Sequence, residues 1–360
     1  MIEEGRFFVP GPTEVRPEVL DAMRRPMIFH RTPEMEALME RAMRRLGMVF
    51  GTGRTVHVIS GSGTAAMELA VRSGTLRRVL AVVHGDFGER FARMAESCGR
   101  EVVRLTCEPG DVVPLDRVRE ALAGGGFDAV TVTHSETAVG VLADVEGIAR
   151  IARESGECLV LVDAVSSAGG APIAMDAWGV DCVVSASQKA LAVPPGLGFA
   201  AASARLLERA RVARDRGTYL DLLRYEEFAA RWQSPTTPAI PLLYALDVQM
   251  EAIEREGLVT RFERHRAMAA ACADWIDRAA GQGAPVQIVA KAGHRSPTVT
   301  AIRSAAAPAI LAGMRAEGFT LGGGQAPIAG NSFRIGHMGD HSVPGVRRLL
   351  DALERVLRTL

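Results

Sequence analysis

The chain has 360 residues, and 48% of them are hydrophobic, which is enough for a substantial core in two domains or in one large domain with a lobe. Its 42 basic and 42 acidic residues cancel, so the bulk charge favours neither nucleic acid nor an anionic membrane as a partner. The five cysteines include no Cys-x-x-Cys pair, the N-terminus has no export signal, and no apolar run reaches roughly 18 residues. We expect a globular cytoplasmic protein with reduced thiols.

Residues 55–199 alternate short apolar runs with amphipathic stretches, which predicts crossover units around a mostly parallel sheet in an α/β fold. The predicted strands cover residues 55–59, 79–83, 128–132, 158–162 and 182–184. The predicted helices cover residues 64–73, 88–98, 115–123 and 145–154. Ligands of such sheets bind at the carboxyl ends of the strands, so the residues that follow each strand are the candidate site.

The pattern changes after residue 240. A long helical stretch at 242–279, strand-like runs at 285–290 and 298–302, and a terminal helix at 343–360 predict a smaller α+β domain. We therefore divide the chain into an N-terminal segment (1–15), a large domain (16–240) and a small C-terminal domain (241–360). Residues 231–241 contain three prolines and are expected to be extended.

A glycine-rich turn follows the first predicted strand. In Ser60-Gly-Ser-Gly-Thr-Ala65, small residues precede a helix, so backbone amides can approach an anion at the positive helix end. The turn is a candidate phosphate site. It also fits a loose dinucleotide fingerprint, Gly61-x-Gly63-x-x-Ala66, so a dinucleotide-binding protein remains an alternative.

Two further loops follow strands and contain polar or aromatic side chains. Phe87, in the run Gly85-Asp-Phe-Gly-Glu-Arg90, could stack on a planar ligand. In the loop at 134–137, Thr137 could offer a hydroxyl group. A metal site at His134 and Glu136 is less favoured, because no third ligand lies nearby in the sequence.

An acid and an amine follow the last two predicted strands. Asp163 ends one of them, and burial of its carboxylate would be costly without a cation or hydrogen-bond donor beside it. Lys189, in Ser187-Gln-Lys189, is one of two lysines among forty arginines, and the other, Lys291, is expected to be an ordinary surface residue. Because an arginine cannot act as a nucleophile, a lysine kept here is a candidate for covalent catalysis.

Together these pieces match the needs of pyridoxal phosphate, which are a lysine for its aldehyde, an anion cradle and a carboxylate for its ring nitrogen. Arg334, in the alternating run Asn331-Ser-Phe-Arg-Ile335, lies beside glycines in the sequence and could hold a substrate carboxylate with two parallel hydrogen bonds.

With these residues collected, the chain resembles the class V aminotransferases of fold type I, and most closely the alanine/serine:glyoxylate group. The resemblance begins at Val9-Pro-Gly-Pro-Thr13 and extends through Ser62-Gly-Thr64, Val162-Asp-Ala-Val-Ser-Ser167 and Ser187-Gln-Lys189 to Phe333-Arg-Ile-Gly-His337. It implies a mostly parallel seven-stranded sheet in the large domain and pyridoxal 5'-phosphate as the cofactor.

The resemblance also implies a role for each site residue. Lys189 would be the Schiff-base lysine and proton shuttle, Asp163 the partner of the ring nitrogen, and Arg334 the clamp for the substrate carboxylate. The remaining residues would contact the cofactor or line the substrate pocket: Ser62, Gly63, Thr64 and Gln188 at the phosphate, Phe87 and Val165 on the two ring faces, Thr137 at the phenolic oxygen, and Gly11 in the pocket. The family shares its sites across a homodimer, so Thr237 would reach the partner's phosphate.

The sequence thus predicts a transaminase that moves an amino group from alanine or serine to glyoxylate or pyruvate in two half-reactions. A 2-aminoethylphosphonate transaminase and a lyase of the same fold are alternatives, since an arginine holds a phosphonate as readily as a carboxylate. A desulfurase is disfavoured, because the loop at 322–331 contains no cysteine.

Overall fold

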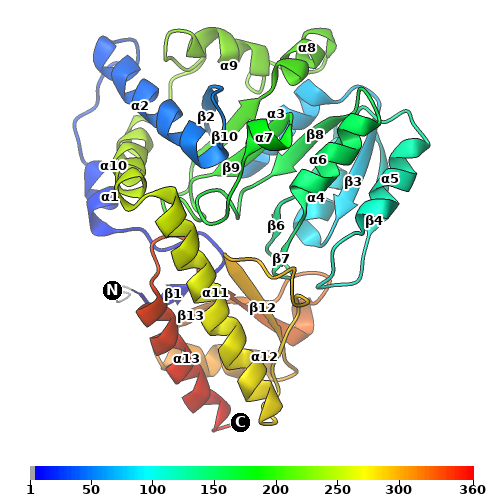
Figure 1. Ribbon diagram of the computed structural model, residues 1–360. Helices are drawn as coiled ribbons and strands as arrows, with labels where there is room; N and C mark the ends of the chain where they lie inside the picture. The colour runs from blue at the N-terminus through cyan, green and yellow to red at the C-terminus, as the bar shows by residue number, and fades with distance from the viewer. Residues whose placement is uncertain (1–4) are drawn as a thin grey trace.

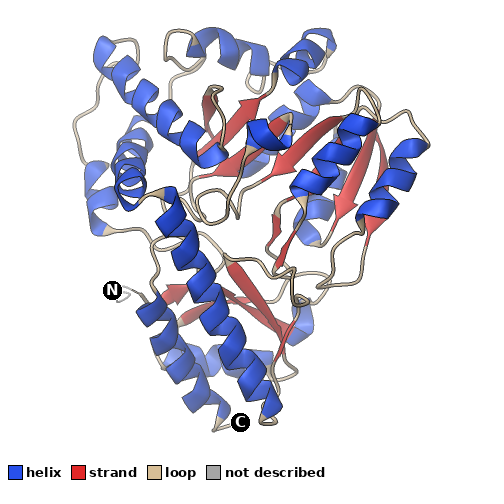
Figure 2. Cartoon of the chain, in the orientation of Figure 1, coloured by secondary structure: helices blue, strands red, loops and turns tan. Residues whose placement is uncertain are grey.

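The computed structural model describes residues 5–360, which form two lobes of unequal size, each built around its own sheet (Figure 1). Helices and loops surround the large sheet, while the smaller sheet lies against a pair of long helices (Figure 2). No helix within residues 5–360 combines the length and the apolar character that a membrane span requires. The predicted α/β fold with a second, smaller α+β part is confirmed.

Within residues 5–360 the large sheet has seven strands in the order β2-β10-β9-β8-β5-β3-β4, in which β10 runs antiparallel to both neighbours and the other pairs are parallel. Its strands are β2 (Val56–Ser60), β3 (Arg78–Val83), β4 (Glu101–Thr106), β5 (Ala129–Thr133), β8 (Leu159–Asp163), β9 (Cys182–Ala186) and β10 (Leu197–Ala202). A two-stranded ribbon, β6 (Ser135–Glu136) with β7 (Val141–Leu142), follows β5.

The central strands are buried on both faces, which explains their continuous apolar runs. In β8, Val160 and Val162 pack in one core cluster, while Leu159 and Leu161 pack in a second cluster on the opposite face. The helices of this lobe are α1 (Pro17–Ala22), α2 (Pro33–Phe50), α3 (Gly63–Gly74), α4 (Asp86–Ser97), α5 (Leu115–Ala123), α6 (Val145–Glu154), α7 (Met175–Trp178), α8 (Ala204–Val212) and α9 (Leu222–Ala229). The four helices and five strands predicted for this region therefore agree with the structure to within two residues.

The smaller sheet has the order β1-β13-β14-β12-β11 within the described chain. Its strands are β1 (Phe7–Phe8), β11 (Gln287–Ile288), β12 (Val299–Arg303), β13 (Thr320–Gly323) and β14 (Ser332–Gly336), and its helices are α11 (Leu258–Gly281), α12 (Ala307–Ala316) and α13 (Val343–Leu357), with a short 3-10 turn (Ala329–Asn331). The N-terminal segment joins this sheet, because β1 pairs in parallel with β13. Residues 1–4 of that segment lie outside the described residues.

Two predictions for the C-terminal part need correction. The helical stretch expected at 242–279 is two helices, α10 (Ile240–Glu256) and α11, which meet at Gly257 with a φ of 79°, a conformation that favours glycine and ends a helix. The strand expected at 285–290 contains only the two residues of β11, which pair with β12 at the end of the sheet.

Helix α10 packs with the large lobe, since Leu243, Leu246 and Met250 are buried in the same core cluster as α2. The boundary between residues 240 and 241 stays a prediction. Helix α11 then runs from the junction between the lobes along the smaller sheet (Figure 1).

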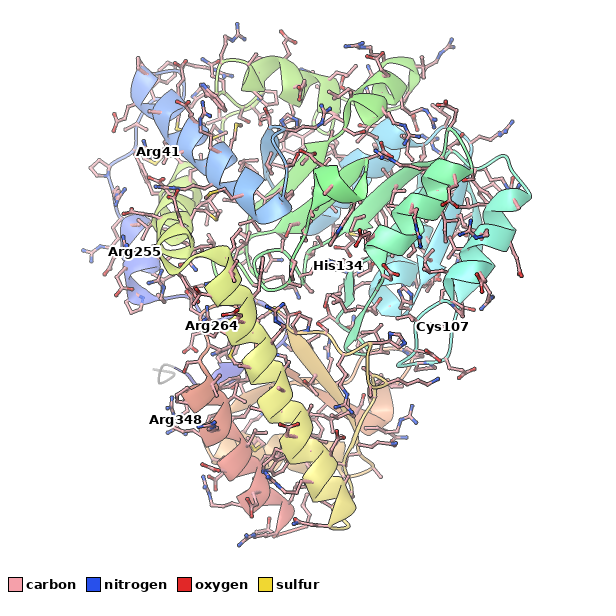
Figure 3. The ribbon with its side chains drawn as sticks, viewed as in Figure 1. Arg41, Cys107, His134, Arg255, Arg264 and Arg348 are labelled. Atoms are coloured by element: carbon pink, nitrogen blue, oxygen red, sulfur yellow. The ribbon has the colours of Figure 1, made fainter. Side chains whose placement is uncertain are left out.

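Arg261 ties the two lobes together near the start of α11. Its side chain is almost completely buried, unlike the surface arginines of the helices, and it donates to the carbonyls of Gly169 and Ala190 at 2.9 and 2.7 Å. It also pairs with Glu256 and, at 3.0 Å, with Asp340. Arg264, one turn further along α11, lies close to the same junction (Figure 3). Because a buried guanidinium without partners is costly, these contacts fix the position of the loop after Lys189.

Candidate active site

Lys189 lies in the turn after β9, at the carboxyl edge of the large sheet. Its amine donates to the carbonyl of Pro10 and lies 5.9 Å from the centroid of the Phe87 ring. Burial, together with the positive charge of Arg334, lowers the pKa of Lys189 from 10.5 to about 8, while Asp163 opposes the shift. A much larger fraction of this amine is therefore neutral near pH 7 than of an ordinary lysine, and the neutral amine can act as a base or nucleophile.

Lys291, the second lysine, is confirmed as a surface residue. Its amine is exposed and pairs with Asp111, which raises its pKa.

Asp163 ends β8 and is 2% exposed. One carboxylate oxygen accepts a hydrogen bond from the backbone N–H of Val165 at 2.9 Å, and the other contacts the hydroxyl of Thr133 at 3.3 Å. Burial raises the pKa of Asp163, and these two donors and the charge of Lys189 counteract it. A protonated ring nitrogen is the kind of partner that such a buried carboxylate requires.

The turn at 62–64 begins helix α3, as expected for an anion site. Ser62 precedes the helix without capping it, and the side chains of Ser62 and Thr64 are exposed. A Cβ atom on Gly63 would lie 2.8 Å from Val165 Cγ2, so this position tolerates only glycine. Next to Lys189 in the sequence, the buried Oε1 of Gln188 has no hydrogen-bond partner among residues 5–360, which leaves it available to a ligand.

The loop that carries Thr137 is fixed by a buried carboxylate. Glu136 accepts hydrogen bonds from the backbone N–H groups of Phe87, Gly88 and Ala138 at 3.0–3.1 Å. Burial raises its pKa to about 7. The Thr137 hydroxyl lies 2.6 Å from that of Ser166. From the sequence, Glu136 is only a less favoured metal ligand. Its structural role could not be predicted, because its partners are backbone groups that no residue pattern reveals.

Arg334 lies on β14 and points toward this loop. Its Nε donates to the carbonyl of Gly323 at 2.8 Å, and its Nη1 contacts the carbonyl of Thr137 at 3.4 Å and Oε1 of Gln325 at 2.8 Å. Burial lowers the pKa of this guanidinium. The glycines predicted beside it are confirmed, because Gly322 is its partner across the sheet.

The N-terminal segment brings Gly11 to the amine. Gly11 has a φ of 101°, and a Cβ atom there would lie 2.5 Å from Lys189 Cδ. Thr13 holds this segment in place, since its N–H donates to the carbonyl of Gln188 and its hydroxyl to that of Lys189, each at 3.0 Å.

Thr237 stands apart from these contacts. It is exposed on the segment that leads into α10, and two residues further on the N–H of Ala239 donates to Ser60 Oγ at 2.9 Å. Its segment thus lies beside the start of the glycine-rich turn of the same chain. Its expected contact with a partner subunit stays a prediction.

His134 and Glu136, the weaker metal candidates, have other partners. His134 lies at the edge of the large sheet near the smaller lobe (Figure 3), with Nδ1 3.0 Å from Ser167 Oγ. Burial lowers its pKa to about 4. Within the part of the chain that the structure describes, no three His, Cys, Asp or Glu side chains gather in a way that could hold a metal ion.

The sequence profile of the family described as Aminotransferase class-V matches residues 7–308. The chain is a class V aminotransferase. It is 37% identical to an uncharacterized aminotransferase of Methanocaldococcus jannaschii, over 98% of this chain and 93% of that protein, and 34% identical to the serine–glyoxylate aminotransferase of Methylorubrum extorquens, over 93% and 86%. The crystal structure of the alanine–glyoxylate aminotransferase of Nostoc sp. superposes with a TM-score of 0.90 at 32% identity, over 99% of this chain and 97% of that one.

This class V aminotransferase therefore has the predicted fold type I, and pyridoxal phosphate is its cofactor. The residues present fit that group. A desolvated amine, a buried carboxylate in need of a cation, a helix N-terminus and the Gln188 side chain all end or follow strands at one edge of the sheet. The match to the aminotransferase family also favours this enzyme class over the dinucleotide-binding alternative.

We expect Gly11→Ala to impair cofactor capture severely, because the added methyl group would overlap the side chain of Lys189. The measurement is the fraction of protein that retains cofactor absorbance after incubation with pyridoxal phosphate and gel filtration. Gly99→Ala is the matched control, since Gly99 has a φ of 78° but nothing within 4 Å of a Cβ atom. If Gly11→Ala and Gly99→Ala lose the cofactor equally, backbone strain at a positive φ explains the loss. That result would contradict the predicted overlap with Lys189.

The lowered pKa of Lys189 predicts that its amine becomes reactive at a lower pH than the amine of Lys291. The neutral amine is the reactive form, so its fraction rises tenfold per pH unit below about 8 and levels off above it, whereas Lys291 keeps rising through pH 9. Limited reductive methylation of the cofactor-free chain, followed by peptide mass spectrometry, resolves the two lysines. A Lys189 profile that still rises tenfold between pH 8.5 and 9.5 would contradict the assignment.

Proposed function

We propose that this class V aminotransferase moves an amino group from a small amino acid, alanine or serine, to a small oxo acid, glyoxylate or pyruvate. The observation that carries the proposal is the placement of three charged side chains at one edge of the large sheet. Asp163 ends β8, Lys189 follows the neighbouring strand β9, and Arg334 contacts the loop that carries Thr137. An amine, a carboxylate that can hold a ring nitrogen and a cation that can hold a substrate carboxylate thus meet at this edge.

Pyridoxal phosphate, when bound, supplies an aldehyde for the amino group and a ring that accepts the electron pair of the substrate α-carbon. In this proposal Lys189 holds the cofactor at rest, and its freed Nζ takes the α-proton of the amino donor. A pKa of about 8 suits this task, because the amine can both accept and return a proton near neutral pH.

The remaining side chains orient the reactants. Asp163 keeps a proton on the ring nitrogen, and Phe87 and Val165 pack on the two faces of the ring. Ser62, Gly63, Thr64 and Gln188 hold the phosphate group, and Thr137 contacts the phenolic oxygen. Two copies of the chain complete each other's sites in this proposal, with Thr237 directed at the partner's phosphate.

The names of similar proteins support small substrates. Two of the glyoxylate aminotransferases to which the chain is similar, those of Methylorubrum extorquens and Nostoc sp., are named for serine and for alanine as donors.

The test is a steady-state screen of donors against glyoxylate and pyruvate, with 2-aminoethylphosphonate as the competing donor. We expect alanine or serine to give the highest kcat/KM. Loss of one member of a buried charge pair costs about 2–5 kcal/mol, so Arg334→Ala should lower kcat/KM by roughly 30-fold or more.

Arg303→Ala is the matched control for this screen, because Arg303 is exposed on the neighbouring strand β12. Preference for 2-aminoethylphosphonate would replace the proposed substrates by the phosphonate alternative. No turnover with any amino acid would contradict the proposal as a whole.

A further inference from the structure

The guanidinium of Arg334 is already engaged by the protein itself. A carboxylate binds it through two parallel N–H groups on neighbouring nitrogens, so each edge of the guanidinium that can receive a carboxylate includes Nε or Nη1. In the structure Nε donates to the carbonyl of Gly323, and Nη1 to Oε1 of Gln325 and, over a longer distance, to the carbonyl of Thr137. A two-point contact with a substrate therefore requires one of these acceptors to leave.

Of the three acceptors, Gln325 is the one that can move. The carbonyl of Gly323 belongs to β13, which pairs with β14, and that of Thr137 lies in the loop fixed by the buried carboxylate of Glu136. Gln325 instead offers a flexible side chain at the start of the loop at 324–331, in which Ala326, Pro327 and Ala329 to Asn331 are exposed. Its backbone carbonyl accepts only a turn hydrogen bond, from Ile328 at 2.9 Å.

The nitrogen of the Gln325 amide anchors this side chain to the large lobe. Its Nε2 donates to Asp86 Oδ2 at 2.5 Å, and Asp86 is the first residue of α4, next to Phe87. Asp86 also lies 3.6–3.9 Å from the guanidinium groups of Arg93 and Arg90. Gln325 thus bridges an anion on the large lobe, Asp86, and a cation on the smaller lobe, Arg334.

We propose that Gln325 occupies the carboxylate position on Arg334 in the free enzyme, is displaced by the incoming substrate, and thereby sets the affinity and selectivity for carboxylates. The inference rests on the proposed role of Arg334 in substrate binding. A carboxylate displaces the amide because it brings a full negative charge to the guanidinium and can form two parallel hydrogen bonds with it, whereas the amide oxygen carries no net charge and accepts one. A neutral ligand gains no such advantage and is excluded.

The experiment measures binding of propionate, an unreactive carboxylate, and of propionamide, its neutral isostere, to the cofactor-loaded enzyme by isothermal titration calorimetry. Gln325→Ala removes the competing acceptor and should tighten propionate binding about tenfold or more, as expected for one hydrogen bond to a charged group. Gln325→Glu places a carboxylate between Arg334 and Asp86; Asp86 repels it, but Arg334 attracts it more strongly than the amide, so it should weaken propionate binding. Propionamide binding should change little in either variant, and Gln282→Ala, an exposed position at the end of α11, should change neither.

The outcomes separate this inference from the proposed function. If Arg334→Ala leaves propionate binding intact, the proposed carboxylate site itself is wrong. If Arg334→Ala abolishes binding but both Gln325 variants bind propionate like the wild type, the role of Gln325 is overturned. Weaker propionate binding in Gln325→Ala would also overturn it, since the amide would then assist the substrate. The opposite directions expected for the two variants cannot arise from misfolding, and retained cofactor absorbance checks that both are folded.

Discussion

The desolvation of one amine beside one carboxylate is the constraint on which the site depends. Burial lowers the pKa of Lys189 and raises that of Asp163, and each charge partly offsets the shift of the other. Burial disfavours the charged form of each group. A ligand that offers an electrophilic carbon to the amine and a cationic nitrogen to the carboxylate would stabilise both groups. The cofactor of the class V family offers both the carbon and the nitrogen.

The fold builds the site from segments that lie far apart in the sequence. Asp163 and Lys189 follow neighbouring parallel strands, Gly11 comes from the N-terminal segment that joins the smaller sheet, and Arg334 comes from that sheet itself. The buried Arg261 holds the junction of the two lobes through the carbonyl of Ala190, directly after Lys189. The geometry of the amine therefore depends on how the two lobes pack, as well as on the large sheet.

The sequence predicts the elements that depend on local pattern. Apolar runs buried on both faces and helices with one apolar face predicted five strands of the large sheet and four helices to within two residues, but not β4 and β10. The rule that ligands bind after parallel strands led to Asp163 and Lys189. Contacts made through backbone groups or long-range packing have no such signature. Glu136 caps the first turn of α4 from a loop distant in the sequence. Nothing in the sequence distinguishes the buried Arg261 from the other arginines, most of which are exposed. Gln325 is recognised only through its geometry with Arg334, and the role proposed for Thr237 would require a second copy of the chain.

The most direct measurement of the central claim is the site of covalent attachment of the cofactor. The protein, loaded with pyridoxal phosphate, is reduced with sodium borohydride, digested and examined by mass spectrometry. Only two lysines compete, which makes the result unambiguous. The account predicts that the reduced pyridoxyl group is found on Lys189 and not on Lys291. Attachment to Lys291, or no attachment to either lysine, would contradict it.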